Sequence, residues 1–151
     1  MHLDWQFKPF KELSLSEFHD IIALRLKAFV IEQNCTYLDL DGKDKKAYHA
    51  VVRDGKGDVV ATGRILSPGV SFQEVAIGRV VVAKDLRESK VGTELMEKCI
   101  QFIYDEFGKV PIKISAQKHL ENFYNKFGFI STGKEYNEDS IPHVEMLLEI
   151  K

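Results

Sequence analysis

The sequence predicts an α/β fold in which helices flank a mixed β-sheet, in the order β-α-β-β-β-α-β-α-β-β. A valine-rich segment, a long amphipathic segment and a second apolar segment follow one another between residues 77 and 116, which is typical of a parallel β-α-β unit. Upstream, two apolar segments flank Asp54–Asp58, whose sequence DGKGD is typical of a hairpin turn. A chain of 151 residues can form one domain that buries about two-thirds of the surface exposed when it is unfolded. We therefore expect a single domain over residues 1–151.

The N-terminal half predicts a strand, a capped helix and the hairpin. Ser14 or Ser16 is a candidate N-cap for the helix, and Glu17 has the spacing of a capping-box partner for Ser14. The expected elements are a strand at 5–10, a helix from residue 14 or 16 to about residue 33, an acidic loop at 37–44, and the hairpin strands 48–52 and 59–65.

The C-terminal half is organised around the β-α-β unit. Its first strand is apolar on both faces at Val80–Ala83, which predicts a central, buried strand. The helix that follows, from Val91 to Phe107, carries an apolar residue at every fourth position, as expected when one face packs on a core. The other expected elements are a strand at 110–116, a helix from 117 to about 126 that Gly128 stops, and closing strands at 129–133 and 143–150.

A short charged loop, Arg87–Gly92, connects the buried strand to this helix. At the start of a helix several backbone N–H groups lack intrahelical partners, and the helix dipole adds a partial positive charge. A phosphate fits such a place: Arg87 and Lys90 would add charge, and Gly92 carries no side chain where an anion would approach the backbone. The spacing alone also fits an ordinary strand–helix connection with a solvated arginine and lysine.

Composition excludes several classes of protein. With 44% hydrophobic and 29% charged residues the chain reads as globular, neither disordered nor membranous, and a net charge of −2 gives no reason to expect a nucleic-acid partner. No basic segment followed by an apolar run opens the chain, so we expect no signal peptide, and no apolar stretch approaches the ~20 residues of a membrane helix. Cys35 and Cys99 lie far apart in unlike settings, which fits a reducing compartment. We therefore expect a cytoplasmic protein with no membrane partner.

Metal binding is the less favoured interpretation of the acidic loop. Asp39, Asp41 and Asp44 suggest a calcium loop, but Gly42 falls in the wrong place and no bidentate acid follows at the twelfth position. The histidines show no metal-ligand spacing. We therefore expect no metal site, and a salt-bridging or helix-capping role for this loop.

Two motifs, together with the order of the elements, resemble the GCN5-related N-acetyltransferase (GNAT) superfamily. The loop at 87–92 resembles the motif Arg/Gln-x-x-Gly-x-Gly/Ala, with Lys90 in place of the first glycine, and YNKFGF at 124–129 resembles the later signature, a tyrosine followed by x-Lys-x-Gly-Phe. Three further segments resemble the ElaA subgroup: FVIEQ at 29–33, YLDLDG at 37–42 and IPH at 141–143. The resemblance spans essentially the whole chain and implies the mixed sheet of a GNAT fold.

The resemblance implies acetyl-CoA as the co-substrate. In this superfamily the valine-rich strand and the next parallel strand diverge, and the pantetheine arm pairs with the backbone exposed between them. An amide of Val80 or Val82 would polarise the acetyl carbonyl as an oxyanion hole does, and Gln117 occupies the place of an asparagine that contacts the cofactor in many members. The implied cofactor-binding residues are Val80, Val81, Val82, Arg87, Glu88, Ser89, Lys90, Val91, Gly92, Thr93, Gln117 and Tyr124.

The resemblance also places Tyr124 where the superfamily carries a general acid for the departing thiolate. A buried core tyrosine in an aromatic cluster is the alternative. For the general base, Glu74 precedes the central strand, where some members place a catalytic glutamate, and His143 begins the strand that borders the acceptor cleft. Further candidates for the base are Glu32, His49 and His119.

For several polar residues the sequence leaves both a functional and a structural role open. Arg25, Glu32 and Gln33 follow the subgroup pattern, and they would either shape the acceptor site or tie the first helix to its loop. The acidic segments Asp39–Asp44 and Glu135–Asp139 would either favour a cationic amine or form solvated faces.

Two functions of different classes stay open. The first is a cytoplasmic acetyl-CoA-dependent N-acetyltransferase, which moves the acetyl group by direct transfer in a ternary complex to a small-molecule or peptide amine. The second is a catalytically silent module that binds or senses acyl-CoA. Tyr124 favours the first, because a pure binder needs no donor at the thiol. The resemblance is compatible with a homodimer, and it does not identify the acceptor.

Overall fold

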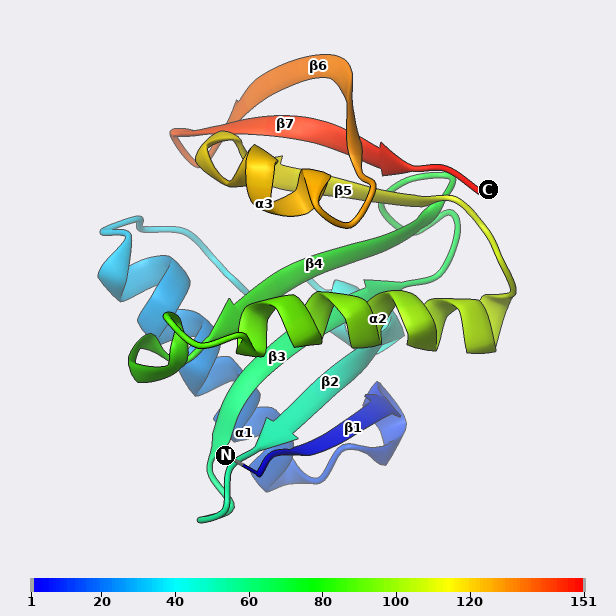
Figure 1. The fold of residues 1–151 in the computed structure, drawn as a ribbon. Coiled ribbons are helices and arrows are strands. Elements are labelled where there is room, and N and C mark those ends of the chain that lie inside the picture. The colour runs from blue at the N-terminus through cyan, green and yellow to red at the C-terminus, as the bar shows by residue number, and fades with distance from the viewer. Residues whose placement is uncertain (1, 151) are drawn as a thin grey trace.

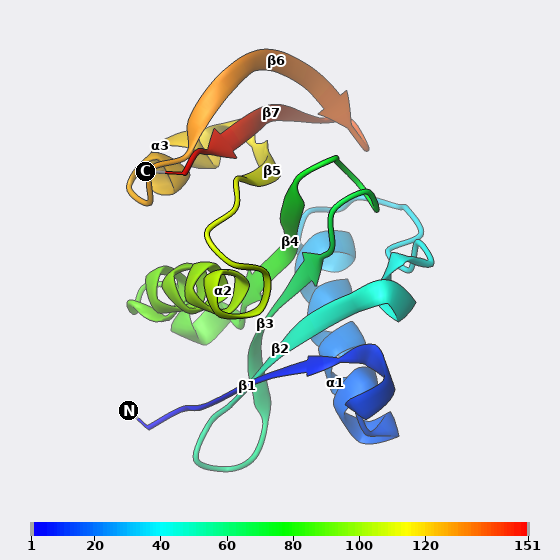
Figure 2. The same cartoon turned by 90° about the vertical axis from the view of Figure 1, so that its right-hand side faces the viewer.

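A mixed β-sheet of seven strands forms the centre of the protein, in the order β1-β2-β3-β4-β5-β7-β6 (Figure 1). The structure is a computed structural model that describes residues 2–150. Helix α1 covers one face of the sheet and α2 the other, as Figure 2 shows. The strands are β1 (Asp4–Pro9), β2 (Ala47–Arg53), β3 (Val59–Leu66), β4 (Val75–Val82), β5 (Ile112–Gln117), β6 (Ile130–Glu138) and β7 (Ile141–Leu148). The α-helices are α1 (Leu15–Arg25), α2 (Val91–Phe107) and α3 (Glu121–Asn125), so the predicted order of elements is confirmed.

Helix α1 begins at the predicted capping box. The Ser14 hydroxyl accepts a hydrogen bond from the backbone N–H of Glu17 (3.0 Å), and the Glu17 carboxylate accepts one from the backbone N–H of Ser14 (2.9 Å). The α-helix ends at Arg25, and a π-helical segment, Leu26–Glu32, continues it. The predicted extent of this helix, to about residue 33, is therefore confirmed, but its C-terminal part has π-helical geometry. π-helical turns are uncommon and often occur at functional sites.

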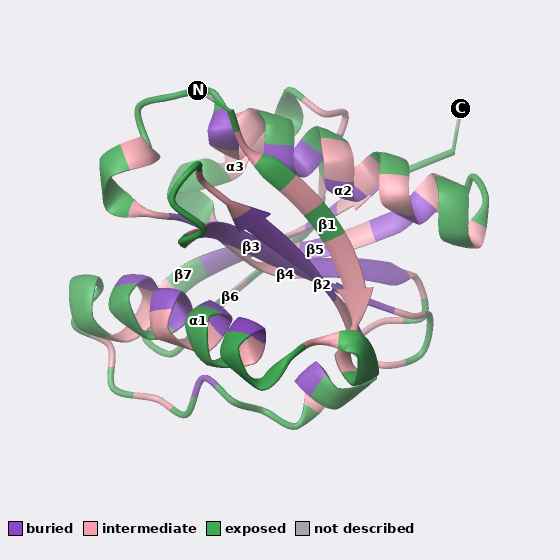
Figure 3. Ribbon diagram, turned by 90° about the horizontal axis from the view of Figure 1, so that it is seen from below, coloured by how far each residue is buried: buried purple, intermediate pink, exposed green. Residues whose placement is uncertain are grey.

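Helix α2 packs its apolar stripe on the sheet, as its periodicity predicts. Leu95, Met96, Cys99 and Ile103 are fully buried. They belong to one cluster with apolar side chains of β2, β3, β5 and β7. Figure 3 shows that buried residues concentrate in the central strands, whereas the outer faces of α1 and α2 are exposed. This helix is therefore held by burial of its stripe, and its first turn lies at the end of β4.

Strands β4 and β5 run in parallel, but they pair only at their beginnings. Val75 pairs with Ile112 and Ala76 with Lys113, and no later pair joins the two strands within the described chain. From there β5 pairs along its length with β7 on its other side. Figure 1 shows β4 and β5 diverging from this point. One edge of β4 beyond Ala76 therefore has backbone groups that β5 does not use.

The C-terminal elements differ in length from the prediction. Helix α3 is short and follows a 3-10 turn, Lys118–Leu120, where the sequence predicts one longer helix. The helix ends at Asn125, and Gly128, the predicted stop, follows in the turn at φ +98°, where a Cβ would lie 2.9 Å from Leu148. Strand β6 extends to Glu138, beyond its predicted end at residue 133, because its polar part pairs with β7 at the solvated edge of the sheet. Polar residues at an edge strand carry no periodic apolar signal, which explains why the sequence underestimates β6.

None of the helices described here is long and apolar enough to cross a membrane.

Candidate active site

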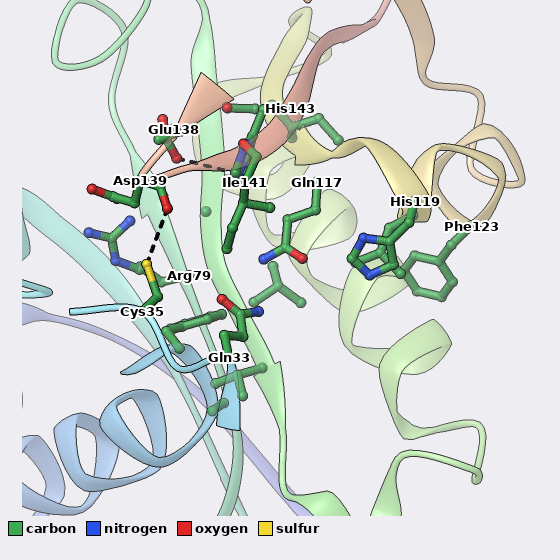
Figure 4. A pocket seen from close by; sticks show the side chains of 18 of the residues that line it. Gln33, Cys35, Arg79, Gln117, His119, Phe123, Glu138, Asp139, Ile141 and His143 are labelled. Atoms are coloured by element: carbon green, nitrogen blue, oxygen red, sulfur yellow. Dashed lines mark hydrogen bonds and ion pairs between the residues drawn. The ribbon is translucent and has the colours of Figure 1, made fainter. Parts of the chain in front are cut away.

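A cleft of about 620 Å³ lies where β4 and β5 diverge. Figure 4 shows it from close by, between the π-helical segment, β4, the start of α3 and the turn between β6 and β7. Its lining combines residues from both halves of the chain: Ala28, Phe29, Glu32, Gln33, Cys35, Tyr37, Ile77, Gly78, Arg79, Val80, Val81, Val82, Arg87, Gly92, Ile114, Ser115, Gln117, His119, Leu120, Phe123, Tyr124, Glu138, Asp139, Ile141 and His143.

The wall formed by β4 offers backbone to the cleft. The predicted residues Val80, Val81 and Val82 all line it. The Val81 side chain packs against Leu24 of α1 and Ala28 of the π-helical segment, whereas Val82 belongs to the core cluster under α2. Because these side chains have apolar partners, the polar groups that this wall contributes are those of the backbone.

The start of α2 forms one end of the cleft. Arg87 and Gly92 line it. The Arg87 guanidinium donates two hydrogen bonds, from Nε to the Val82 carbonyl (2.9 Å) and from Nη1 to the Glu32 carboxylate (2.5 Å). The hydrogen bond from Arg87 lowers the pKa of Glu32. A Cβ at Gly92 would make only ordinary contacts, 3.8 Å to Val82 and 3.9 Å to Phe123. The first turn of α2 thus borders the cleft at Gly92, beside the Arg87 guanidinium.

The remaining predicted loop residues surround this end without lining the cleft. Glu88, Ser89 and Lys90 are exposed, and Val91 is buried. The Ser89 hydroxyl accepts a hydrogen bond from the backbone N–H of Val91 (3.3 Å). Their role, and that of Thr93, in binding a cofactor stays a prediction.

Tyr124 lies on α3 and reaches the cleft beside Phe123. Its ring packs edge-to-face on Phe123 (5.1 Å between centroids) and on Phe129 (6.3 Å), so the predicted aromatic surroundings are present. Burial raises the pKa of Tyr124 to about 12, and the neighbouring Cys99 acts in the same direction. The hydroxyl is therefore a proton-bearing donor at neutral pH. Gln117, at the end of β5, also lines the cleft.

The candidate bases fall into two groups. His143, Glu32 and His119 line the cleft. The buried His143 ring has Nδ1 2.8 Å from the Ile141 carbonyl oxygen and Nε2 3.5 Å from the Glu138 carboxylate.

Glu74 and His49 are not among the residues that line the cleft. Glu74 precedes β4 and lies 3.3 Å from the Lys113 ammonium, so the structure does not bring it together with Tyr124. His49 is buried, with Nε2 2.9 Å from the Asp44 carbonyl oxygen, and burial lowers the pKa of its imidazole. These contacts tie both side chains to their own parts of the sheet.

The acidic loop is a salt-bridging loop, as the sequence favours. We call its residues and partners the ion cluster: Arg25, Asp39, Asp41, Asp44, Arg64 and Arg79. Arg25 lies 2.8 Å from Asp39 and 2.8 Å from Asp44, and Arg64 lies 2.8 Å from Asp41. Arg25 thus ties the first helix to its loop, and the three aspartates are engaged by arginines. In the part of the chain that the structure describes, no group of acidic, histidine or cysteine residues is arranged to hold a metal ion.

Sequence reasoning missed two features of the cleft. Cys35 donates a hydrogen bond from its thiol to the Asp139 carbonyl (3.3 Å), which joins the loop after the first helix to the β6–β7 turn (Figure 4). No local pattern predicts a contact between residues so distant in the chain. Arg79 also lines the cleft. Arg79 is the one charged residue within the apolar sequence of β4, and this irregularity could have marked it as a candidate site residue.

The chain matches known proteins over nearly its whole length. A family model described as an acetyltransferase (GNAT) domain matches residues 20–150. Protein ElaA of Escherichia coli is 40% identical over 149 residues, which cover 98% of this chain and 97% of that protein. The crystal structure of E. coli ElaA has a TM-score of 0.91 at 39% identity and covers 98% of this chain and 100% of its own. A structure described as an acyl-CoA N-acyltransferase from Pseudomonas aeruginosa has a TM-score of 0.91 at 35% identity, covering 97% of this chain and 99% of its own.

Proposed function

This chain belongs to the GNAT acetyltransferase family and to its ElaA-like subgroup, and from that premise we propose that it transfers the acetyl group of acetyl-CoA to an amine, directly and within a ternary complex. The observation that carries the proposal is the divergence of β4 from β5 beyond Ala76, because it opens the cleft and leaves the backbone of β4 free along one wall. A pair of parallel strands that stayed paired would have no such wall.

The residues of the cleft fit a coenzyme A thioester. Along β4, the backbone groups of Val80 and Val82 that face away from β3 and that β5 leaves unpaired would pair with the amides of a pantetheine arm, beside the Val82 carbonyl that Arg87 engages. At the start of α2, the first-turn N–H groups with Arg87 and Lys90 would hold a pyrophosphate, and Gly92 keeps the approach to the backbone open. Glu88, Ser89, Val91 and Thr93 would complete this end of the site, and Gln117 lines the cleft from the end of β5.

Tyr124 serves as the donor at the sulfur. When bound, acetyl-CoA supplies a thioester that an amine attacks and whose thiolate leaves. A thiol has a pKa of about 8.5, so complete proton transfer from a tyrosine of pKa about 12 is uphill by about 5 kcal/mol. Tyr124 therefore acts first as a hydrogen-bond donor to the developing thiolate, which stabilises that charge before any proton moves.

His143 serves as the base toward the amine. An alkyl amine with a pKa of about 10.4 needs roughly 4.6 kcal/mol to become neutral at pH 7, so a proton acceptor beside it is useful. His143 lines the cleft, and its Nε2 lies 3.5 Å from the Glu138 carboxylate. The structure gives Glu74 no comparable position, because it lies beside Lys113.

The test is the variant Tyr124→Phe, which keeps the ring and removes the donor. We expect kcat for thiol release to fall about 100-fold, while the Kd of acetyl-CoA in calorimetry stays within about threefold of wild type, since the hydroxyl is needed mainly in the transition state. Tyr104→Phe is the matched control, because Tyr104 lies on α2 and is not among the lining residues. A Tyr124→Phe variant with wild-type kcat would remove Tyr124 from the mechanism.

The acceptor is found with a panel of amines: polyamines, amino acids, aminoglycosides and lysine peptides. Turnover with one class identifies the acceptor. Tight binding of acetyl-CoA without turnover on any amine would instead favour the silent acyl-CoA-binding module. We place the protein in the cytoplasm, where the free thiols of Cys35 and Cys99 are stable.

A further inference from the structure

Arg79 lies in the middle of β4, and its backbone has a conformation that residues other than glycine rarely adopt. Its φ is +50°, in the left-handed region that is unfavourable for residues other than glycine. The register between β3 and β4 shifts here, since Thr62 pairs with Val81 but Arg64 pairs with Gly78. Two steps along β3 thus correspond to three along β4. This is a β-bulge, which bends a strand and redirects the residues beside it.

The Arg79 side chain anchors this conformation. Its Nε lies 2.8 Å from Oδ1 of Asp39 in an ion pair, and its Nη2 donates to the backbone carbonyl of Asp39 (3.0 Å). Nη2 also lies 3.5 Å from the Asp41 carboxylate. The guanidinium stands over the ring of Tyr37, 5.8 Å from its centroid. These contacts fix the side chain, and through it the backbone of the bulge.

Asp39 is itself fixed from its other side. Its side chain is fully buried, and its Oδ2 accepts a hydrogen bond from Arg25 of α1 (2.8 Å). The Tyr37 hydroxyl donates to its Oδ1 (2.9 Å). A buried carboxylate with these partners cannot move without leaving a charge unpaired, which is costly. Helix α1, the acidic loop and β4 are therefore clamped together at Asp39.

The bulge lies directly before the part of β4 that forms the wall of the cleft. Pairing with β5 ends at Ala76, and Val80–Val82 line the cleft after it. Because β5 does not hold this part of β4, the direction of its backbone depends on β3 and on the bulge at Arg79. Figure 4 shows Arg79 at the Cys35 end of the cleft, away from Gln117 and His119.

We propose that Arg79, clamped by Asp39, is a positioning residue that presents the Val80–Val82 backbone to acyl-CoA. The inference rests on the proposed function, since it concerns the wall assigned there to the pantetheine arm. The guanidinium acts on the strand, and its ionic partners are Asp39 and Asp41. Arg79 thus connects a buried cluster of charges to a binding surface made of backbone.

A matched pair of variants separates the backbone role from the charge. Arg79→Gly and Arg79→Ala both remove the guanidinium, but glycine adopts positive φ at no steric cost whereas alanine does not. We expect Arg79→Ala to bind coenzyme A about 5- to 30-fold more weakly than Arg79→Gly in calorimetry, which is the cost of the left-handed conformation expressed as affinity. Arg79→Gly should stay within about threefold of wild type. Thermal unfolding of both variants records the loss of the ion pairs that they share.

Rescue by glycine is the result that a merely structural role would not give. Wild-type affinity in both variants would overturn the proposal, because the bulge would then need no anchor. Equal weakening in both would also overturn it, because the guanidinium itself would then contact the ligand.

Asp39→Asn provides a second test that does not depend on the folding of Arg79→Ala. We expect it to weaken coenzyme A binding in the wild-type background. Its effect should be much smaller in Arg79→Gly, which has no guanidinium for Asp39 to pair with. Equal effects in both backgrounds would contradict the clamp. Coenzyme A affinity is the readout throughout, so failure to acetylate any amine would reject the proposed transferase and leave this result interpretable. Absence of coenzyme A binding in the wild type would overturn both.

Discussion

The ion cluster and the loop Arg87–Gly92 both border the cleft, and they use their charges in opposite ways. In the ion cluster, Arg25 and Asp39 are each 1% exposed, and arginines and aspartates pair within the protein. In the loop, residues 87–90 are exposed, and Arg87 pairs with Glu32 at the surface. A buried charge is strongly destabilising unless an opposite charge pairs with it. Removing one member of the ion cluster should therefore destabilise the fold, because it leaves a buried charge unpaired. At the start of α2 the cations are exposed, so a ligand can reach them, and the Arg87–Glu32 pair there is partly solvated.

The largest effect is expected from breaking the ion cluster at its centre. Arg25→Met leaves the buried carboxylates of Asp39 and Asp44 without their shared partner. We expect a loss of about 3–5 kcal/mol in the free energy of unfolding, measured by urea denaturation. Lys27→Met, at an exposed position just beyond α1, is the matched control and should change stability by less than about 0.5 kcal/mol. A small loss in Arg25→Met would show that the cluster is not needed for folding.

The loop should show the reverse behaviour, a loss of binding with little loss of stability. Gly92→Glu would place a carboxylate at the start of α2, where we propose that the pyrophosphate binds. We expect coenzyme A affinity to fall at least about 100-fold, or about 2.7 kcal/mol. Gly92→Ala is the control, because its Cβ would make only ordinary contacts at 3.8–3.9 Å and adds no charge. Unchanged affinity in Gly92→Glu would reject this placement of the pyrophosphate.

The smallest effect concerns the rim of the ion cluster and its dependence on pH. Burial opposes ionisation of Asp41, but hydrogen bonds from Arg64 and from the backbone of Lys43 prevail and lower its pKa to about 2. A depressed carboxylate pKa stabilises the folded state above the unfolded value, near pH 4, and this contribution is lost as the pH falls toward 2. Asp41→Asn should therefore lose less stability than wild type between pH 4 and pH 2. We expect a difference of about 1 kcal/mol, because Asp41 is partly exposed and solvent screens its ion pairs. Identical acid unfolding curves would contradict this.

Predictions from sequence succeeded where local chemistry decides the structure. The Ser14–Glu17 capping box and the buried stripe of α2 form as predicted, since both depend on residues within a few positions of one another. Gly128, the predicted stop, lies at positive φ in the turn that follows α3, which itself ends at Asn125. The π-helical segment Leu26–Glu32 lacked any such signal. Its Ala28 packs in one cluster with Leu24 of α1 and with Val81, a partner from another part of the chain.

The candidate site was predicted in part. Val80, Val82, Arg87, Gly92, Gln117, Tyr124 and His143 do line one cleft, although their roles in binding and catalysis stay predictions. Glu74 lies apart from them beside Lys113. Of the two acidic segments, Asp39–Asp44 is engaged by arginines, whereas Glu138 and Asp139 line the cleft. Composition does not distinguish a salt-bridged segment from one that lines a cleft, because each segment carries three acidic residues.

The sequence by itself determined the order of the elements, the family motifs and the face that α2 buries. These follow from periodicity and from residues close together in the chain. The tertiary structure alone decided that β4 leaves β5 after Ala76, that Arg79 adopts a bulge held by Asp39, and that Cys35 meets Asp139 across the cleft. Each of these depends on contacts between distant segments, whose geometry is set only when the whole sheet has formed.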